Sequence, residues 1–321
     1  MDLIESILYL GETNMITIYG EILIDMNKKI ESNSFDYFVG GAPFNVAYAI
    51  MKTEGNVKFI GNVGNDLMGK HIKSFVISQN MDASFISIDN NHNTTLAFVI
   101  NDENGERNFC FARKNGADYY LKKEYLEEIK KADIVHIGSL MISEDYGYEY
   151  AKSIIEEAKK YNKKISFDIN YRDDIFSNKN EAINRYREIY NKCDVVKVSK
   201  EELYLFTEED EIKKALVKFA KENQKVFVTL GKDGSLLYSN NKIIKAKSIS
   251  INPIDTTGAG DAFYGTMLSF IDQIGYEKFF SLEDKISDYL YLANIQGALA
   301  TLKKGALDGV VSKQELLKNL K

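Results

Sequence analysis

Short apolar segments rich in β-branched residues alternate with longer amphipathic stretches along most of this chain. The apolar segments have the composition of strands that are buried on both faces. The amphipathic stretches repeat with a helical period. Alternation of this kind predicts an α/β fold whose parallel sheet is covered by helices on both faces. The predicted strands are Ile16–Ile24, Val57–Ile60, Ile134–Ile137, Ile165–Ile169, Val195–Val198 and Val226–Leu230, and the predicted helices include Tyr146–Tyr161, Asn180–Tyr190 and Glu211–Asn223.

Two regions depart from this pattern. Residues 26–38 and 94–111 alternate aromatic and polar positions, and the second region contains the turn signal Asp102-Glu103-Asn104-Gly105. We interpret them as antiparallel strands outside the main sheet that form a small lid. Residues 1–14 precede the first strand and are either an extension or a helix on the surface of the sheet.

The composition limits the class of protein. The chain has 321 residues and a mass of 36.5 kDa, which fits two domains of about 150 residues or one large α/β domain. Its 41 basic and 47 acidic residues give a net charge of −6, which argues against nucleic acid or an anionic membrane surface as a partner. Cys110 and Cys193 are too few for a disulfide framework, and the three histidines lack zinc-binding spacing. With no long apolar run and no basic leader, the chain is expected to be cytoplasmic.

The segment Asp255-Thr256-Thr257-Gly258-Ala259-Gly260-Asp261-Ala262-Phe263 is the strongest chemical signal in the sequence. We expect it to follow a strand at Ile249–Ile254 and to enter a helix that runs through Phe270. Small residues let several backbone N–H groups converge at the helix start, where the helix dipole adds positive charge, so the segment suits a phosphoryl group. Asp261 in the first turn either stays ionised and accepts a proton from an attacking hydroxyl, or merely caps the helix.

A second glycine cluster is a weaker signal. Gly64 to Lys70 nearly matches a P-loop, but His71 stands where a hydroxyl residue must bind Mg²⁺. The segment instead predicts a turn into a helix that is capped by Asn65 or Asp66.

Polar residues also follow several predicted strands. Asp25 closes the first strand, and Gly40-Gly41-Ala42-Pro43-Phe44-Asn45 follows a lid strand, with Pro43 suited to the first turn of a helix. Each residue is also explained as a turn or a cap, but a carboxylate and an amide here suit a polyol. Because ligands gather at the carboxyl ends of strands in open α/β sheets, further polar groups there favour one cleft along the sheet edge. These groups are Asp168-Ile169-Asn170-Tyr171-Arg172, Ser199-Lys200-Glu201-Glu202 and Thr229-Leu230-Gly231-Lys232-Asp233-Gly234.

Together these motifs resemble the ribokinase-like (PfkB) carbohydrate kinases over roughly residues 15–310. Segments 40–45 and 255–261 carry most of the resemblance. It implies a three-layer α/β/α sandwich with a mostly parallel central sheet and a small β-sheet lid. Residues 15–321 would form the kinase domain, with a lid from about 26–38 and 94–115 inserted in it and residues 1–14 as an N-terminal extension.

The resemblance further implies ATP-dependent phosphoryl transfer to a sugar hydroxyl, with Mg²⁺ and K⁺ as the accompanying ions. Asp261 matches the catalytic base, and Gly258, Ala259 and Gly260 match the anion hole. The sugar-binding positions match Asp25, Gly40, Gly41, Asn45, Arg113 and Arg172, and the ATP-binding positions match Asn170, Ser199, Thr229, Gly231, Gly234 and Asn294. Glu202 matches the residue that helps to organise Mg²⁺ indirectly, although Ser199 replaces a frequent Asn. Asp255 and Thr257 match part of a monovalent-cation loop.

Finer similarity bears on the sugar. Ala42 and Leu23 differ from the Lys and Asn of the ribose branch, which disfavours ribose. Segments 20–25, 111–118 and 168–172 are similar to fructokinases, so we expect D-fructose to be phosphorylated at O6. 2-Keto-3-deoxygluconate is the alternative substrate, and a non-catalytic regulator that binds sugar or nucleotide is an alternative of another class. The exposed strand edges of the lid also suit a homodimer.

Overall fold

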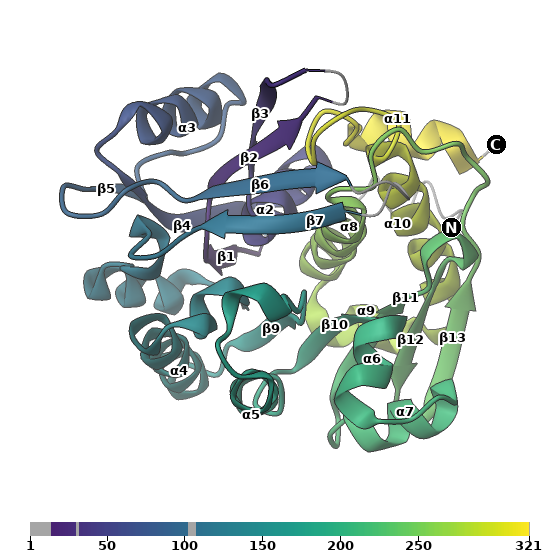
Figure 1. Cartoon of the computed structure of the whole chain (residues 1–321). Coiled ribbons are helices and arrows are strands. Elements are labelled where there is room, and N and C mark those ends of the chain that lie inside the picture. The colour runs from purple at the N-terminus through teal and green to yellow at the C-terminus, as the bar shows by residue number, and fades with distance from the viewer. Residues whose placement is uncertain (1–13, 30–31, 102–106, 321) are drawn as a thin grey trace.

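The computed structural model describes residues 14–29, 32–101 and 107–320, which form two sheets and the helices around them (Figure 1). The predicted N-terminal extension, apart from Asn14, lies outside the described residues. The turn signal at 102–105 lies outside them as well.

The larger sheet has nine strands, and its centre is parallel. Strands from β5 to β11 run parallel, whereas β12 and β13 add an antiparallel edge. Val195, Val196 and Val198 have no exposed surface, as expected for a strand that is covered on both sides. In spatial order the strands are β13 (Lys242–Ala246), β12 (Ser235–Ser239), β11 (Lys225–Thr229), β10 (Val195–Ser199), β9 (Lys164–Asp168), β8 (Ile134–Ile137), β1 (Ile16–Tyr19), β4 (Val57–Gly64) and β5 (Ile86–Asp89).

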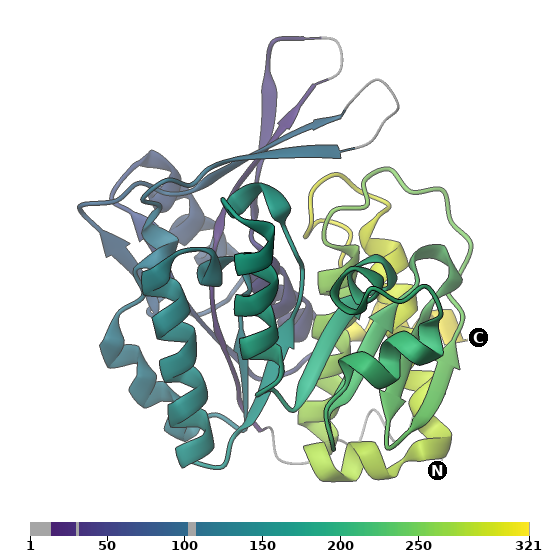
Figure 2. The ribbon, with the colours of Figure 1, turned by 60° about the horizontal axis from the view of Figure 1, so that its bottom comes forward.

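Helices cover both faces of this sheet, which confirms the expected three-layer fold (Figure 2). One face carries α2 (Ala42–Lys52), α8 (Ala259–Ile274) and α10 (Ile286–Ala300), and the other carries α4 (Asp145–Lys160), α5 (Lys179–Tyr190), α6 (Lys200–Thr207) and α7 (Ile212–Phe219). Each face has its own buried apolar core, with Phe44 and Met267 in one and Ile154 and Phe167 in the other. The remaining α-helices are α3 (Leu67–Ser78), α9 (Tyr276–Ser281) and α11 (Lys313–Leu317). Among the described residues, every helix is too short or too polar to traverse a bilayer.

The smaller sheet stands apart from the three layers (Figure 2). Its strands, in spatial order, are β3 (Phe35–Gly40), β2 (Leu23–Lys28), β6 (Leu96–Asn101) and β7 (Arg107–Ala112). β2 and β6 are parallel, and the other two pairs are antiparallel. The expectation of a separate small sheet is therefore confirmed.

The predicted strand Ile16–Ile24 is wrong in one respect, because it is two strands in two sheets. β1 ends at Tyr19 and β2 begins at Leu23, so the chain leaves the main sheet at Gly20-Glu21-Ile22. Asp25 therefore lies inside β2, opposite Phe38 of β3, and does not end a strand of the main sheet. Every residue from 16 to 25 is buried, so the hydrophobic pattern gives no sign of the break.

The expected strand at Ile249–Ile254 is also wrong, because residues 247–256 are irregular. Pro253 has no backbone N–H to donate to a neighbouring strand, and the Ile254 side chain is exposed. The helix predicted over residues 211–223 ends early, at Phe219. The cap of α3 is as expected, since Asp66 accepts a hydrogen bond of 2.8 Å from the N–H of Gly69.

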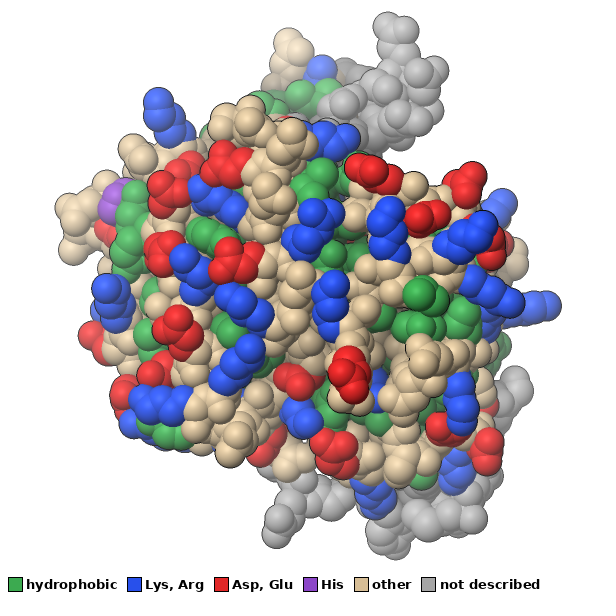
Figure 3. Space-filling view, turned by 90° about the horizontal axis from the view of Figure 1, so that it is seen from below, with side chains coloured by type: hydrophobic (Ala, Val, Ile, Leu, Met, Phe, Trp, Pro, Cys, Tyr) green, Lys and Arg blue, Asp and Glu red, His purple; other side chains and the backbone are tan. Residues whose placement is uncertain are grey.

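The strand order reverses beside β1, which lies between β4 and β8. In open parallel sheets a ligand cleft forms outside the carboxyl ends of the strands at such a point. On the face seen in Figure 3, basic and acidic side chains are interspersed. The described residues of that face form no extended basic surface of the kind that holds a nucleic-acid backbone.

Candidate active site

A cavity of about 410 Å³ lies at the carboxyl ends of the parallel strands, where the small sheet meets the main body. Its walls come from β2, from the starts of α2 and α8, from the segment that follows β9, and from the ends of β10 and β11. Most residues predicted from the sequence line it, namely Asp25, Gly41, Asn45, Asn170, Arg172, Ser199, Glu202, Thr229, Thr257, Gly258, Gly260 and Asp261.

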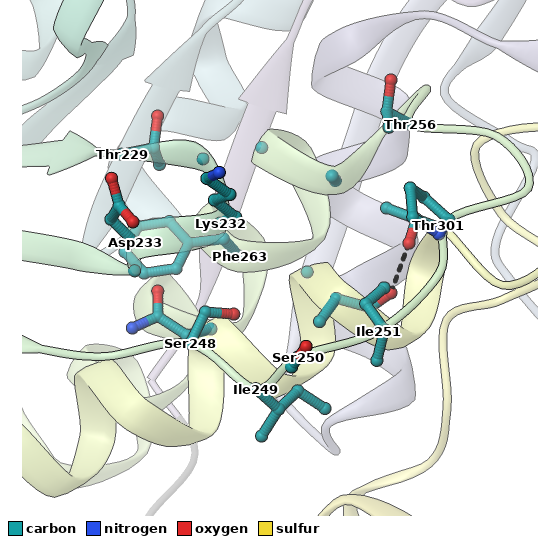
Figure 4. A pocket seen from close by; sticks show the side chains of 18 residues that line it. Thr229, Lys232, Asp233, Ser248, Ile249, Ser250, Ile251, Thr256, Phe263 and Thr301 are labelled. Atoms are coloured by element: carbon teal, nitrogen blue, oxygen red, sulfur yellow. Dashed lines mark hydrogen bonds between the residues drawn. The ribbon is translucent and has the colours of Figure 1, made fainter.

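A second cavity, of about 510 Å³, adjoins the first, and the two share Thr229, Thr256 and Gly260 in their walls. Residues 248–251 form one of its walls, and Phe263 and Thr301 project from other sides (Figure 4). The dashed line in Figure 4 is the hydrogen bond of 2.7 Å that the Thr301 hydroxyl donates to the carbonyl of Ala298. The predicted residues that line only this cavity are Gly231, Gly234, Ala259 and Asn294.

The boundary between the two cavities is the start of α8. Gly258 is the N-cap residue with φ 76, and a Cβ there would lie 2.6 Å from Cβ of Ala306, so only glycine fits without strain. The N–H groups of the first helical turn have no carbonyl partner one turn earlier in the helix, although that of Ala259 approaches Thr256 O at 3.4 Å. This turn therefore has the geometry of an anion-binding site.

Asp261 lies in that first turn, and its side chain is buried in the wall of the first cavity. Nδ2 of Asn45 donates a hydrogen bond of 2.8 Å to Oδ2 of Asp261. Burial raises the pKa of Asp261, while Lys197 and the Asn45 hydrogen bond oppose that rise. This differs from the expectation of an ordinary carboxylate at a helix start, because burial outweighs the nearby positive charge. A carboxylate with a raised pKa is a stronger base.

The small sheet places Asp25 in the same cavity. A Cβ at Gly40 would lie 2.1 Å from Oδ2 of Asp25, so Gly40 makes room for this carboxylate without itself lining the cavity. Burial, with Asp261 and Asp255 nearby, raises the pKa of Asp25 to about 7, and Arg172 opposes the rise. Asp25 and Asp261 thus stand on two elements across one cavity.

The two predicted arginines differ in position. Arg172 lines the cavity. Arg113 does not: it is buried behind the wall, where its Nε donates a hydrogen bond of 2.8 Å to Asp118 and its Nη1 donates one of 2.7 Å to the carbonyl of Leu140. Leu140 itself is a wall residue. Arg113 therefore supports the wall, and the structure does not place it against a ligand in that cavity.

Ser199 and Glu202 form a capping box at the start of α6, the alternative that the sequence left open. The Glu202 oxygens accept hydrogen bonds of 2.7 Å from the N–H of Tyr171 and of 2.7 Å from the N–H of Ser199. Both residues also line the first cavity. Capping and contact with a ligand are thus compatible at this position.

The Asp255 carboxylate fastens the loop before α8. Its Oδ1 accepts a hydrogen bond of 2.9 Å from the N–H of Thr257, and its Oδ2 accepts one of 2.9 Å from the N–H of Gly305. Asp255 is buried and does not line either cavity. Among the described residues, no group of three or more His, Cys, Asp and Glu side chains is arranged to hold a metal ion.

Two charged residues at the site were missed by sequence reasoning, whereas a third, Asp168, was expected only as one of the polar groups at a strand end. Lys197 and Glu21 line the first cavity, and Asp168 lies behind Lys197 at the end of β9, with 2.9 Å between Lys197 Nζ and Asp168 Oδ2. The two oxygens of Glu21 have no hydrogen-bond partner among the described residues. Burial raises the pKa of Glu21 to about 8, and Arg113 opposes the rise. A charged residue within an otherwise apolar strand was the available signal for Lys197.

Comparison with known proteins connects this site to a family. The pfkB family of carbohydrate kinases matches residues 5–313. Among curated relatives, "Probable fructokinase-4" of Arabidopsis thaliana is 34% identical over 325 residues and covers 97% of this chain and 98% of the relative. A fructokinase from Xylella fastidiosa solved with bound ATP has a TM-score of 0.86 and 27% identity, covering 95% of this chain and 97% of that one.

A further solved relative is the fructokinase of Vibrio cholerae O395. It has been solved with fructose, ADP and calcium, and as a double mutant with fructose, ADP and potassium. Each structure has a TM-score of 0.88 and 30% identity, and covers 96% of this chain and 99% of the other. These similarities extend over nearly the whole of each chain.

Proposed function

The chain belongs to the pfkB family of carbohydrate kinases, and on this premise we propose that it transfers the terminal phosphoryl group of ATP to O6 of D-fructose. The observation that carries the proposal is the position of Asp261, buried in the wall of a cavity and one residue after Gly260, where the two cavities meet. A carboxylate and an anion-binding helix start at one point are what transfer from a phosphate to an alcohol requires.

In this proposal the sugar occupies the first cavity and the nucleotide the second. Asp25 and Asn45 hold sugar hydroxyls, and Asp261 accepts the O6 proton as O6 attacks the terminal phosphorus. The bond from phosphorus to the ADP oxygen breaks, and amides at the start of α8 receive the phosphoryl charge. Because a carboxylate is a weak base for an alcohol, the proton moves late and positioning contributes more than basicity.

ATP needs a divalent cation, and we propose Mg²⁺, which binds through phosphate oxygens and few protein carboxylates. Both carboxylate oxygens of Glu202 already accept backbone hydrogen bonds, so an indirect role in organising Mg²⁺ suits this residue better than direct coordination. We place K⁺ at the loop of Asp255 and Thr257, which the Asp255 carboxylate ties to Gly305. A relative that has been solved with a potassium ion supports the choice of ion.

The proposal for fructose rests on the names of relatives that span nearly the whole chain. The decisive experiment measures ADP release with Mg²⁺ and ATP in the presence of fructose, 2-keto-3-deoxygluconate, ribose, adenosine or aminoimidazole riboside. We expect the highest kcat/KM with fructose. A higher value with the sugar acid would change the substrate but keep the reaction class, whereas no sugar-dependent ADP release would favour a non-catalytic regulator.

Two further properties belong to the same proposal. We infer a cytoplasmic enzyme, in agreement with the free thiols of Cys110 and Cys193. We also infer a homodimer, because β3 and β7 are edge strands of the small sheet and Tyr37 on β3 is 50% exposed. Sedimentation at micromolar concentration tests the dimer, and a monomer at all concentrations would contradict it.

A further inference from the structure

Lys197 is a cation in a place that favours apolar residues. It is the third residue of β10, between the fully buried Val196 and Val198, and is itself only 6% exposed. A buried ammonium is costly unless it is paired, and its one hydrogen bond within the described residues is the one to Asp168. A lysine carries three N–H donors, so two remain for a ligand.

The ammonium lies against the start of α8. A Cβ built on Gly260 would be 2.9 Å from Lys197 Nζ, so Nζ stands beside the backbone of the turn that resembles an anion-binding site. Gly260 lies where the two cavities meet, and Lys197 lines the first of them. The lysine therefore lies at the place that the proposed function gives to the transferred group.

The charge of the first cavity shows what this ammonium is suited to bind. Four carboxyl groups line it, from Glu21, Asp25, Glu202 and Asp261, against two basic side chains, from Arg172 and Lys197. Burial raises the pKa of Glu21 to about 8 and of Asp25 to about 7, so these two are partly protonated near neutral pH. The carboxyl groups that stay ionised would repel a terminal phosphate unless a cation stood next to it. Burial alone would lower the pKa of Lys197, but Asp168, Glu202 and Asp261 outweigh it, so the pKa is raised and the side chain stays protonated.

We propose that Lys197 is a catalytic residue whose ammonium contacts the terminal phosphoryl group of ATP and balances its charge during transfer. This inference rests on the proposed function. As the bond from O6 to phosphorus forms and the bond to ADP breaks, the O6 proton goes to Asp261 and Lys197 keeps all of its protons. Asp168 holds the ammonium in place and is a positioning residue.

The alternative is a purely structural role, in which Lys197 only forms the buried ion pair with Asp168. The test compares Lys197→Met with Lys225→Met, a matched control. Lys225 is also a buried strand lysine, but it donates to Ser239 and lines neither cavity. We expect Lys197→Met to lower kcat by about 10²-fold, the usual loss for one group that stabilises transition-state charge, with the fructose KM within about threefold. Lys225→Met is expected to keep wild-type kcat.

Binding separates contact with the phosphoryl group from a general effect on the site. Calorimetry would compare ADP with an ATP analogue whose terminal bridging oxygen is replaced by NH. Lys197→Met is expected to weaken the analogue about tenfold and ADP less than about twofold, since only the analogue carries the terminal phosphate. Equal losses for both nucleotides, or a kcat within about threefold of wild type, would overturn the proposal.

A folding defect is addressed by the double variant Asp168→Asn with Lys197→Met, which removes both charges of the pair. The proposal expects the same loss of kcat in this variant, whereas recovery of wild-type kcat would show that the lysine serves only the ion pair. If the wild-type protein phosphorylates no sugar, the proposed function fails. The selective loss of analogue binding would still report on Lys197.

Discussion

Nδ2 of Asn45 donates a hydrogen bond of 2.8 Å to Oδ2 of Asp261, although the two residues are 216 positions apart in the chain. The bond joins the first turns of α2 and α8, which pack side by side on one face of the main sheet. The Asn45 amide, which suits a sugar hydroxyl, is thereby held against the Asp261 carboxylate, which would deprotonate a different hydroxyl of the same sugar. In the proposed function, this contact would therefore couple the orientation of the sugar to that of the base.

Replacement of Asp261 by Asn tests the base directly. The amide keeps the shape of the side chain and cannot accept the O6 proton, so we expect kcat to fall by at least about 10²-fold. The fructose KM should change little. Steady-state measurement of ADP release is sufficient, and turnover close to wild type would remove Asp261 from the mechanism.

In the wild-type protein the hydrogen bond from Asn45 holds the Asp261 carboxylate and lowers the pKa of Asp261. Asn45→Ala removes this hydrogen bond. We expect about a tenfold loss in kcat, because the carboxylate is no longer held. The pKa of Asp261 should rise, so the acidic limb of the kcat profile should move to higher pH. An unchanged limb would mean that this bond does not govern the ionisation of the base.

Gly258→Ala places a Cβ at φ 76 and against Ala306. We expect a loss of about 1–3 kcal/mol in the free energy of unfolding, together with reduced kcat. Gly275→Ala is the matched control, because its φ is 90 but nothing lies within 4 Å of the new Cβ. It should lose stability with kcat intact. Urea denaturation and kinetics on both variants would separate backbone strain from damage to the site.

Glu21 makes stability depend on pH. Its pKa rises from 4.5 unfolded to about 8 folded, so between these values the folded protein holds a proton that the unfolded chain has lost. The free energy of unfolding therefore falls as pH rises through this window, by at most about 1.4 kcal/mol per pH unit for this group. Glu21→Gln should remove that slope, whereas Glu201→Gln, on the exposed side of α6, should keep it. Denaturation at pH 5, 6.5 and 8 would decide.

The proposed K⁺ loop is tested by Asp255→Asn. The change weakens the two backbone hydrogen bonds that order residues 255–257 and Gly305. We expect the KCl concentration for half-maximal activity to rise about tenfold, the usual size of an effect on ligand orientation. Tetramethylammonium chloride would hold the ionic strength constant. If wild-type activity were the same in both salts, the cation proposal would be wrong.

Local chemistry made part of this site predictable. Glycines next to Asp261 at a helix start, and Pro43 before Asn45, specify both turn and helix in a few adjacent residues, and the structure has both helices there. The alternation of apolar strands and amphipathic helices likewise fixed the layers. In these cases the physical cause and its result lie within one short segment.

Other features depend on partners far away in the chain. The division of residues 16–28 between two sheets leaves no mark in hydrophobicity, because both strands are buried where they meet. Arg113 is five residues from Asp118, a spacing that is not typical of contacts within a helix or a strand. The hydrogen bond between them holds the arginine side chain behind the wall of the first cavity. The proposed role of Lys197 depends on its contacts with Asp168 and Gly260, which lie on other elements and are distant in the sequence.

The three residues Gly20-Glu21-Ile22 join β1 of the main sheet to β2, the strand that carries Asp25. Because this connecting segment, the joint between the two sheets, is so short, a change in its length would shift Asp25 and the proposed sugar site relative to the main sheet. Engineers who seek new acceptor alcohols should therefore diversify Leu23 and Ala42, which border the cavity, and leave the joint intact.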